Sequence, residues 1–149
     1  MSRPLSVLHL DSNREWGGGQ NQVRLLMREL AQAGIRQRCI CPAGSPLAKR
    51  LDAEGLPVQP VAWRSGSDPR AFIAIARTAS QFDVVHCHDA HALQLALLPA
   101  KLRGTFLIAS RRVRFKTSAL KWNRADIVIA VSQTVRQELI NSGVHEQRI

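Results

Sequence analysis

Apolar residues along this chain alternate between short runs typical of buried strands and longer stretches with helical spacing. The run 127–131 is apolar throughout, whereas between 20 and 33 the apolar residues recur every three or four positions, as on one face of a helix. Strands are predicted at 5–10, 36–41, 57–63, 83–87, 105–109 and 127–131. Helices are predicted at 20–33, 46–54, 69–81, 90–102, 118–124 and 133–141.

This strict alternation of strands and helices predicts the fold class. Strands separated by helices form parallel sheets, and right-handed crossovers place the helices on both faces. We therefore predict an α/β fold with a Rossmann-like, doubly wound parallel sheet in a single domain of 149 residues. Ligands of such sheets bind at the carboxyl ends of the strands, so the residues that come after each strand are the candidates for a functional site.

The composition is that of an ordinary globular protein, with 45% hydrophobic and 21% charged residues, but the charge is strongly positive. A formal charge of +10 favours partners that carry phosphate: a phosphorylated ligand, an anionic membrane surface or a nucleic acid. Sites for single-stranded nucleic acid combine basic with aromatic residues, and the sequence has no tyrosine, so we expect no nucleic-acid partner. A nucleic-acid complex would show a steep dependence on salt concentration.

No apolar run approaches the ~20 residues of a membrane span, and the first residues lack the features of a signal peptide. We therefore expect a cytoplasmic protein, in which Cys39, Cys41 and Cys87 are reduced. Cys39 and Cys41 share one face of a predicted strand, a spacing that two metal ligands could use. Because no second pair stands at zinc spacing, we interpret them as buried thiols.

Three glycines, Gly17 to Gly19, come after the first predicted strand and precede a helix. Backbone amides at a helix start can approach a phosphate closely, and the helix dipole favours the anion. The dinucleotide fingerprint is incomplete, because its third glycine position is occupied by Gln22, and a Walker lysine is also missing. A plain flexible turn is the alternative interpretation. We expect neither a nicotinamide site nor a P-loop, and no cofactor.

The fourth predicted strand ends in a polar segment with three histidines and an aspartate. Because side chains alternate along a strand, His86 and His88 share one face and Cys87 takes the other. A metal site is one interpretation, but a helix that begins near residue 90 would turn His91 away from the other two, so we expect no metal. We interpret His86 as a hydrogen-bonded core histidine. We expect His88 to face substrate as a polar group or proton handler, with Asp89 beside it.

A basic segment comes directly after the fifth predicted strand. It contains Arg111, Arg112, Arg114 and Lys116, and no acidic residue occurs before Asp126. Much of the positive charge therefore falls on the ligand side of the predicted sheet. Three interpretations remain open: a pocket for a phosphate or a phosphorylated sugar, a patch that faces anionic lipid headgroups, and a solvated basic loop.

The last part of the chain carries the most specific motif. The segment 124–139, RADIVIAVSQTVRQEL, resembles the R-A-D-x-V-I-A-V-S-x-x-V-R-x-x-L stretch of family 4 glycosyltransferases. Segments 141–144 and 147–149 match the residues that come after that stretch in the family. The glycine loop and the segment 83–88 also agree, and they occur in the family's order. The resemblance covers essentially the whole chain.

This resemblance implies one half of a GT-B fold, in which two Rossmann-like domains enclose the active site. Residues 1–149 would be the amino-terminal, acceptor-side domain of a retaining, metal-independent glycosyltransferase. The implied reaction moves a sugar from a nucleotide-sugar donor to a lipopolysaccharide or another surface-glycan acceptor. We expect the carboxyl-terminal domain, which supplies most nucleotide-sugar contacts in the family, to be missing. The chain alone would then be inactive and would need that domain or a partner subunit.

The family's functional residues carry over to matching positions. Gly18 and Gly19 would approach the donor diphosphate, and His88 would be the catalytic histidine that lines the sugar site. Arg111 and Ser132 would edge the cleft. The candidate substrate-binding residues are Gly18, Gly19, Asp89, Arg111, Arg112 and Ser132. Amides and arginines suit this chemistry because negative charge develops on the leaving phosphate. A basic face would also hold the domain at the inner face of the membrane, where lipid-linked acceptors are glycosylated.

The competing hypothesis is a Rossmann-like binding or partner module that stands alone and has no catalytic activity. A final helix that packs on its own sheet would favour such a module. Exposed apolar residues at the strand ends would favour one half of a two-domain enzyme.

Overall fold

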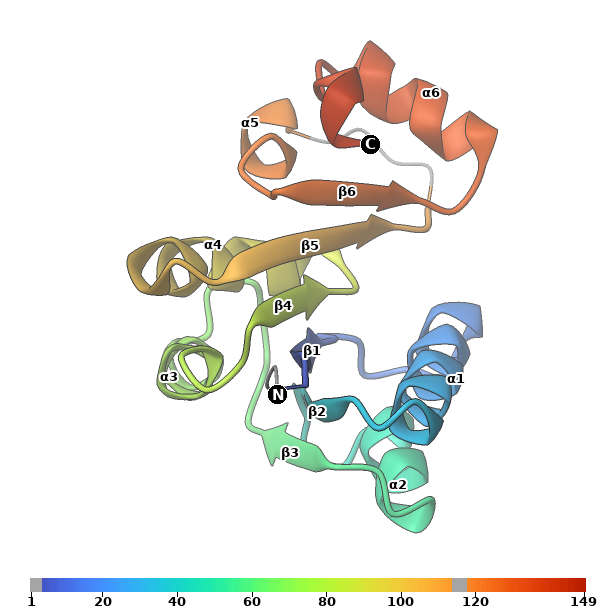
Figure 1. Cartoon of the computed structure of the whole chain (residues 1–149), viewed down its shortest axis with the longest axis vertical. Helices are drawn as coiled ribbons and strands as arrows, with labels where there is room; N and C mark the ends of the chain where they lie inside the picture. The colour runs from blue at the N-terminus through green and yellow to red at the C-terminus, as the bar shows by residue number, and fades with distance from the viewer. Residues whose placement is uncertain (1–3, 114–117) are drawn as a thin grey trace.

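The computed structural model describes residues 4–113 and 118–149, and within them it has the predicted alternation of strands and helices. Six parallel strands lie in the order β3-β2-β1-β4-β5-β6 (Figure 1). The strands are β1 (Ser6–Leu10), β2 (Arg36–Pro42), β3 (Val58–Val61), β4 (Val84–Cys87), β5 (Phe106–Arg111) and β6 (Ile127–Ala130). The helices are α1 (Gly18–Gln32), α2 (Pro46–Ala53), α3 (Pro69–Ala79), α4 (Ala90–Arg103), α5 (Ala119–Trp122) and α6 (Gln133–Asn141), followed by the 3-10 helix η1 (Glu146–Arg148).

Helices cover both faces of the sheet, as expected of a doubly wound fold (Figure 1). On one face α1 and α2 pack on β2, where Val23, Met27 and Leu47 meet the buried, free thiols of Cys39 and Cys41. The other face carries α3, α4 and α5 over the larger core, which α6 joins at the edge strand β6. The predicted Rossmann-like fold and the interpretation of these cysteines as buried thiols are confirmed.

Several boundaries differ from the sequence prediction by one or more residues, and two of these differences bear on the site. Helix α1 begins at Gly18, two residues earlier than predicted. The low helix propensity of glycine costs little in the first turn, because the amides there have no acceptor inside the helix. Strand β5 continues to Arg111, because its last two residues still pair with β6. The part of the predicted basic segment at 114–117 lies outside the described residues.

The winding of the sheet reverses between β1 and β4, which are neighbours. The chain adds β2 and β3 on one side of β1, crosses back through α3, and then adds β4, β5 and β6 on the other side. The amide of His88 donates to the carbonyl of Leu10 (N···O 2.9 Å), which holds the two strand ends together. At such a reversal the helices after the two strands diverge to opposite faces, and a crevice opens at the carboxyl ends of the strands.

Among the helices that the structure describes, none is both long enough and apolar enough to cross a bilayer.

Candidate functional site

A pocket of about 550 Å³ lies at this reversal, and we call it the switch-point pocket. Its walls come from the loop after β1, the start of α1, the segment that joins β4 to α4, and the end of β5. The residues that line it include Ser12, Gly18, Gly19, His88, Asp89, Ser110, Arg111, Arg112, Trp122 and Val131. The structure thus brings together every residue that the sequence predicted for the site except Ser132.

The two glycines form the first turn of α1. Gly17 is the N-cap and has an extended backbone, and Gly18 and Gly19 are the first helical residues. Amides in this position have no acceptor inside the helix, and they carry the positive end of the helix dipole. A Cβ atom added at Gly18 would meet no other atom within 4 Å, so the space in front of this turn is open. The arrangement is suited to binding an anion.

Asp89 has a structural task that the sequence analysis did not predict. It is the N-cap of α4, and its Oδ1 accepts hydrogen bonds from the amides of His91 and Ala92 (both 2.9 Å). The hydroxyl and the amide of Ser12 also donate to its two oxygens, at 2.7 and 2.6 Å. Asp89 therefore ties the loop after β1 to the start of α4, and both of its oxygens already accept bonds from the protein.

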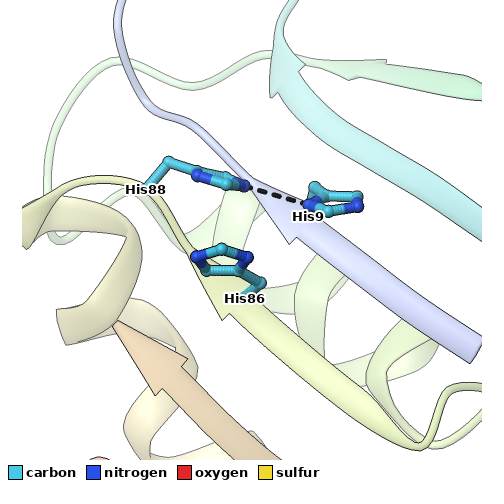
Figure 2. A group of neighbouring side chains, drawn as sticks. All are labelled: His9, His86 and His88. Atoms are coloured by element: carbon cyan, nitrogen blue, oxygen red, sulfur yellow. Dashed lines mark hydrogen bonds between the residues drawn. The ribbon is translucent and has the colours of Figure 1, made fainter. Parts of the chain in front are cut away.

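Three histidines gather where β1 and β4 lie side by side (Figure 2). They lie on the face of the sheet that carries α1, because their neighbours along the strands belong to the larger core on the other face. His9 in β1 pairs in register with His86 in β4, and His88 lies just beyond the end of β4. The atoms His9 Nδ1 and His88 Nε2 are 3.0 Å apart, and His86 Nε2 is 2.7 Å from the hydroxyl of Ser110. His86 is thus the hydrogen-bonded core histidine that we predicted. His91 is exposed and lies outside the cluster, also as predicted.

His9 was missed by the sequence analysis. It lies in the middle of a strand, and its polar neighbours come from a segment 77 to 79 residues away. The signal that could have found it is the predicted strand order, because a Rossmann-like sheet places the first and fourth strands side by side. Two histidines that face the same side of these neighbouring strands would then have been recognised as a pair.

Burial controls the charge of this cluster. It lowers the pKa of His9 to about 4 and that of His86 to about 3, and it lowers the pKa of His88 well below its ordinary value. The nearby charge of Arg112 acts in the same direction on all three. The three imidazoles are therefore neutral at pH 7. Burial raises the pKa of Asp11, and the charge of Asp89 raises it further, against hydrogen bonds from Asn13 and Gln20.

One possible ligand of this cluster is a metal ion. Each of the three histidines offers a ring nitrogen, and these atoms lie within 4.8 Å of one another. A histidine that binds a metal normally donates its other N–H to an acceptor. The other nitrogen of His88, Nδ1, instead faces Nη2 of Arg112 at 2.8 Å, and a guanidinium only donates. His88 therefore does not fit the pattern of a metal ligand in this arrangement.

The two arginines point to opposite faces of the sheet, since Arg111 is the last residue of β5 and Arg112 follows it directly. Arg112 reaches across the histidine face, and its Nη1 donates to the carbonyl of Gly19 at 3.3 Å. Arg111 is buried on the other face, with its guanidinium carbon 5.4 Å from the centre of the Trp122 ring. Burial lowers the pKa of both arginines. The sequence predicted that Arg111 and Arg112 belong to one basic segment. Because β5 continues to Arg111, the two side chains instead lie on opposite faces of the sheet.

Ser132 lies beside the pocket and does not line it. It is the N-cap of α6, and its hydroxyl accepts a hydrogen bond from the amide of Val135 at 3.2 Å. The preceding residue, Val131, takes the place on the pocket wall. The structure therefore gives Ser132 a role in starting a helix, and the predicted substrate contact remains a prediction.

A doubly wound parallel sheet with an open helix start at its switch point defines the class to which the chain belongs, the Rossmann-like α/β domains. Comparison with known proteins narrows this class. The model of the family described as Glycosyltransferase Family 4 matches residues 16–149, so the chain belongs to that family. The sequence-based resemblance is confirmed. No curated protein matches the chain by sequence.

Solved structures agree with this family. The chain is similar to HepE from Anabaena in complex with UDP and glucose, with a TM-score of 0.81 and 18% identity over 97% of this chain and 42% of that one. It is also similar to a glycosyltransferase from Rickettsia africae ESF-5 (TM-score 0.79, 18% identity, 99% and 42% covered). The lipopolysaccharide outer core galactosyltransferase WaaB is a more distant match, with a TM-score of 0.67 and 12% identity, and with 97% and 44% covered.

These likenesses identify the fold as one half of a GT-B glycosyltransferase. The chain spans less than half the length of each of these three structures.

Proposed function

We propose that this domain is the acceptor-side half of a retaining, metal-independent GT-B enzyme that transfers a sugar from a nucleotide-sugar donor to a lipopolysaccharide or another surface glycan. The observation that carries the proposal is the open first turn of α1, which faces the switch-point pocket next to Arg112. The complex of HepE with UDP and glucose supports a nucleotide-sugar donor, and the likeness to WaaB supports a lipopolysaccharide acceptor.

The chemistry of the pocket suits this reaction. When the sugar leaves its nucleotide, negative charge builds up on the departing diphosphate. Amides fixed at a helix start and a half-buried guanidinium can stabilise that charge without reorganising, and one such donor typically contributes about 10²–10³ in kcat. In this domain Gly18, Gly19 and Arg112 take these roles. His88 and Arg111 also line the pocket, among other polar residues.

A second domain is part of the proposal. Val113 and Val131 have 51% and 47% of their surface exposed, and they line the pocket just after the carboxyl ends of β5 and β6. Leu120, in α5, is also exposed (67%). Exposed apolar residues next to a pocket favour a surface that another domain covers. We therefore propose that a nucleotide-sugar domain, in the same polypeptide or in a partner subunit, closes the pocket, and that the chain alone does not transfer sugar.

An NMR titration of the chain with UDP tests the donor side of this proposal. We expect the amide signals of Gly18 and Gly19 to shift, and the signal of Gly104, at the opposite end of the sheet, to stay in place. Gly18→Ala adds a methyl group that meets no protein atom, so the variant folds, but the methyl group occupies the space of the anion. We expect it to weaken UDP binding about tenfold, as for the loss of a hydrogen bond to a charged group. Absence of shifts at both glycines contradicts the donor site.

A transfer assay tests the need for a second domain. The chain is incubated with radiolabelled nucleotide sugars and a lipopolysaccharide acceptor, with and without extract from the source cell. We expect transfer only when the extract supplies the other half. Sugar transfer by the purified chain alone would show that half of the cleft is sufficient, and the two-domain part of the proposal would be wrong.

One observation favours the alternative of a binding module. Helix α6 packs on its own sheet, where Val135 and Leu139 are buried against Val128, so this end of the fold is supported without another domain. A module of this kind would bind UDP in the titration above and would remain inactive after the extract is added. The two experiments together separate the candidates.

A further inference from the structure

The bond between Arg112 and His88 fixes the position of a proton. Nη2 of Arg112 lies 2.8 Å from His88 Nδ1. A guanidinium has five N–H donors and no acceptor, and it does not lose its proton in proteins. His88 Nδ1 must therefore be the acceptor and carry no hydrogen. Since His88 is neutral, its one ring proton lies on Nε2, which points toward His9 (Figure 2).

The same reasoning extends one residue further. His88 Nε2 lies 3.0 Å from His9 Nδ1 and donates its proton to it, so the ring proton of neutral His9 lies on its Nε2. Within the described residues this buried nitrogen has no hydrogen-bond partner, and neither does Oε1 of Gln37 on the adjacent strand β2. The Gln37 side chain is close enough to raise the pKa of His9 against the larger effect of burial. A slight rotation of this amide would give the His9 proton an acceptor.

We propose that His9 and His88 form a relay with fixed protons that holds Arg112 across the start of α1, so that both histidines are positioning residues for this arginine. Each ring nitrogen of His88 is engaged, Nδ1 by Arg112 and Nε2 by His9, and its side chain is buried. The same guanidinium donates to the carbonyl of Gly19. It is thereby fixed beside the amides of the first turn, where an anion would bind. His88 has no nitrogen left with which to exchange a proton with a substrate.

This inference changes the role expected for His88 from a proton handler to a support for a cation. It rests on the proposed function only in naming the anion, the diphosphate of a nucleotide sugar. The order of protons in the relay is a property of the chain itself. It also accounts for the poor fit of a metal, because the nitrogen of His88 that faces the cluster carries the proton that a metal ion would have to displace.

Long-range ¹H–¹⁵N spectra of the histidine rings test the relay directly, since they report which nitrogen carries the proton. In the unmodified chain at pH 7 we expect His88 and His9 to be protonated at Nε2 alone. Arg112→Met removes the donor, and we expect the His88 signals to move toward a mixture of tautomers. A proton on His88 Nδ1 in the unmodified chain would overturn the proposal. So would a Zn²⁺ titration that shifts the ring signals of His9, His86 and His88 together, because the cluster would then be a metal site.

A set of matched variants tests what the relay does for the pocket. In His88→Asn, Oδ1 takes the position of Nδ1 and can still accept from Arg112, whereas His88→Leu cannot. We expect His88→Leu and Arg112→Met each to weaken UDP binding about tenfold, as for a hydrogen bond to a charged group. His88→Asn should recover most of this loss, and His9→Asn should recover in the same way what His9→Phe loses. Exposed His145, changed to Ala, is the control.

The outcomes separate the two proposals. If His88→Asn binds UDP as weakly as His88→Leu, the acceptor is not what matters and the positioning role is wrong. If the unmodified chain does not bind UDP, the donor site is wrong, while the ring spectra still decide on the relay.

Discussion

The three buried histidines make the stability of this domain depend on pH. Burial lowers the pKa of His9 to about 4 and that of His86 to about 3, whereas both groups titrate near 6.5 in the unfolded chain. Between these values the unfolded chain binds more protons, so acidification favours unfolding. The stability that neutral imidazoles provide is complete above about pH 6.5 and is lost as the pH falls toward 4 and 3. Asp11, whose pKa is raised, acts in the opposite direction.

We therefore expect the free energy of unfolding in urea to fall between pH 7 and pH 5, by roughly 2 kcal/mol for each of His9 and His86. His86→Asn should show a smaller fall, because one of the depressed groups is gone. His145→Ala, which removes an exposed ring, should keep the full fall. A free energy of unfolding that stays constant over this pH range in the unmodified chain would contradict the burial of neutral histidines.

At the scale of residues, the sequence predicted which face of the sheet a side chain in β4 occupies, but not which side chains contact each other. The alternation along β4 correctly separated His86 and His88 from Cys87, because it depends only on the local backbone. The contact between His88 and His9 depends on strand pairing, and the orientation of Arg112 depends on how far β5 continues. Both depend on tertiary structure, which a motif within one segment of the sequence does not reveal.

At the scale of elements, variants of Ser132 test whether this residue caps a helix or binds substrate. Its hydroxyl caps α6 through the amide of Val135, and Ala in this position should cost about 1 kcal/mol of stability in urea unfolding. Ser132→Asp should keep the stability, since aspartate caps equally well. UDP binding should be unchanged in both variants, because Ser132 does not line the pocket. Weaker UDP binding at unchanged stability would return Ser132 to the binding site.

The elements themselves were predicted almost completely, since strands and helices alternate with clear caps. Ser45 and Asp68, each followed by proline, cap α2 and α3 as these pairs indicate. The start of α1 was placed two residues too late, because glycine is rare inside helices and was assigned to the loop. That error bears on the proposed donor site, because as helical residues Gly18 and Gly19 present their amides along the helix dipole, which loop residues would not do.

At the scale of the whole molecule, the charge of +10 and the exposed apolar residues at the pocket rim together predict that the chain binds anionic membranes. Each lysine or arginine near an anionic bilayer contributes about 1 kcal/mol, and this attraction extends over a Debye length of ~10 Å at 0.1 M salt but only ~3 Å at 1 M. Apolar contacts by Val113, Leu120 and Val131 would not weaken in this way.

We therefore expect the chain to sediment with vesicles that contain phosphatidylglycerol at low salt, and to remain in solution with pure phosphatidylcholine vesicles. At 1 M salt most of it should be released, since screening removes the contribution of charge. Leu120→Ser and Val131→Ser should leave low-salt binding intact and should reduce whatever fraction resists salt, because that fraction depends on apolar contact. If the chain fails to sediment with anionic vesicles even at low salt, its positive charge serves the pocket and other phosphate ligands, and membrane contact must come from the second domain or from the acceptor itself.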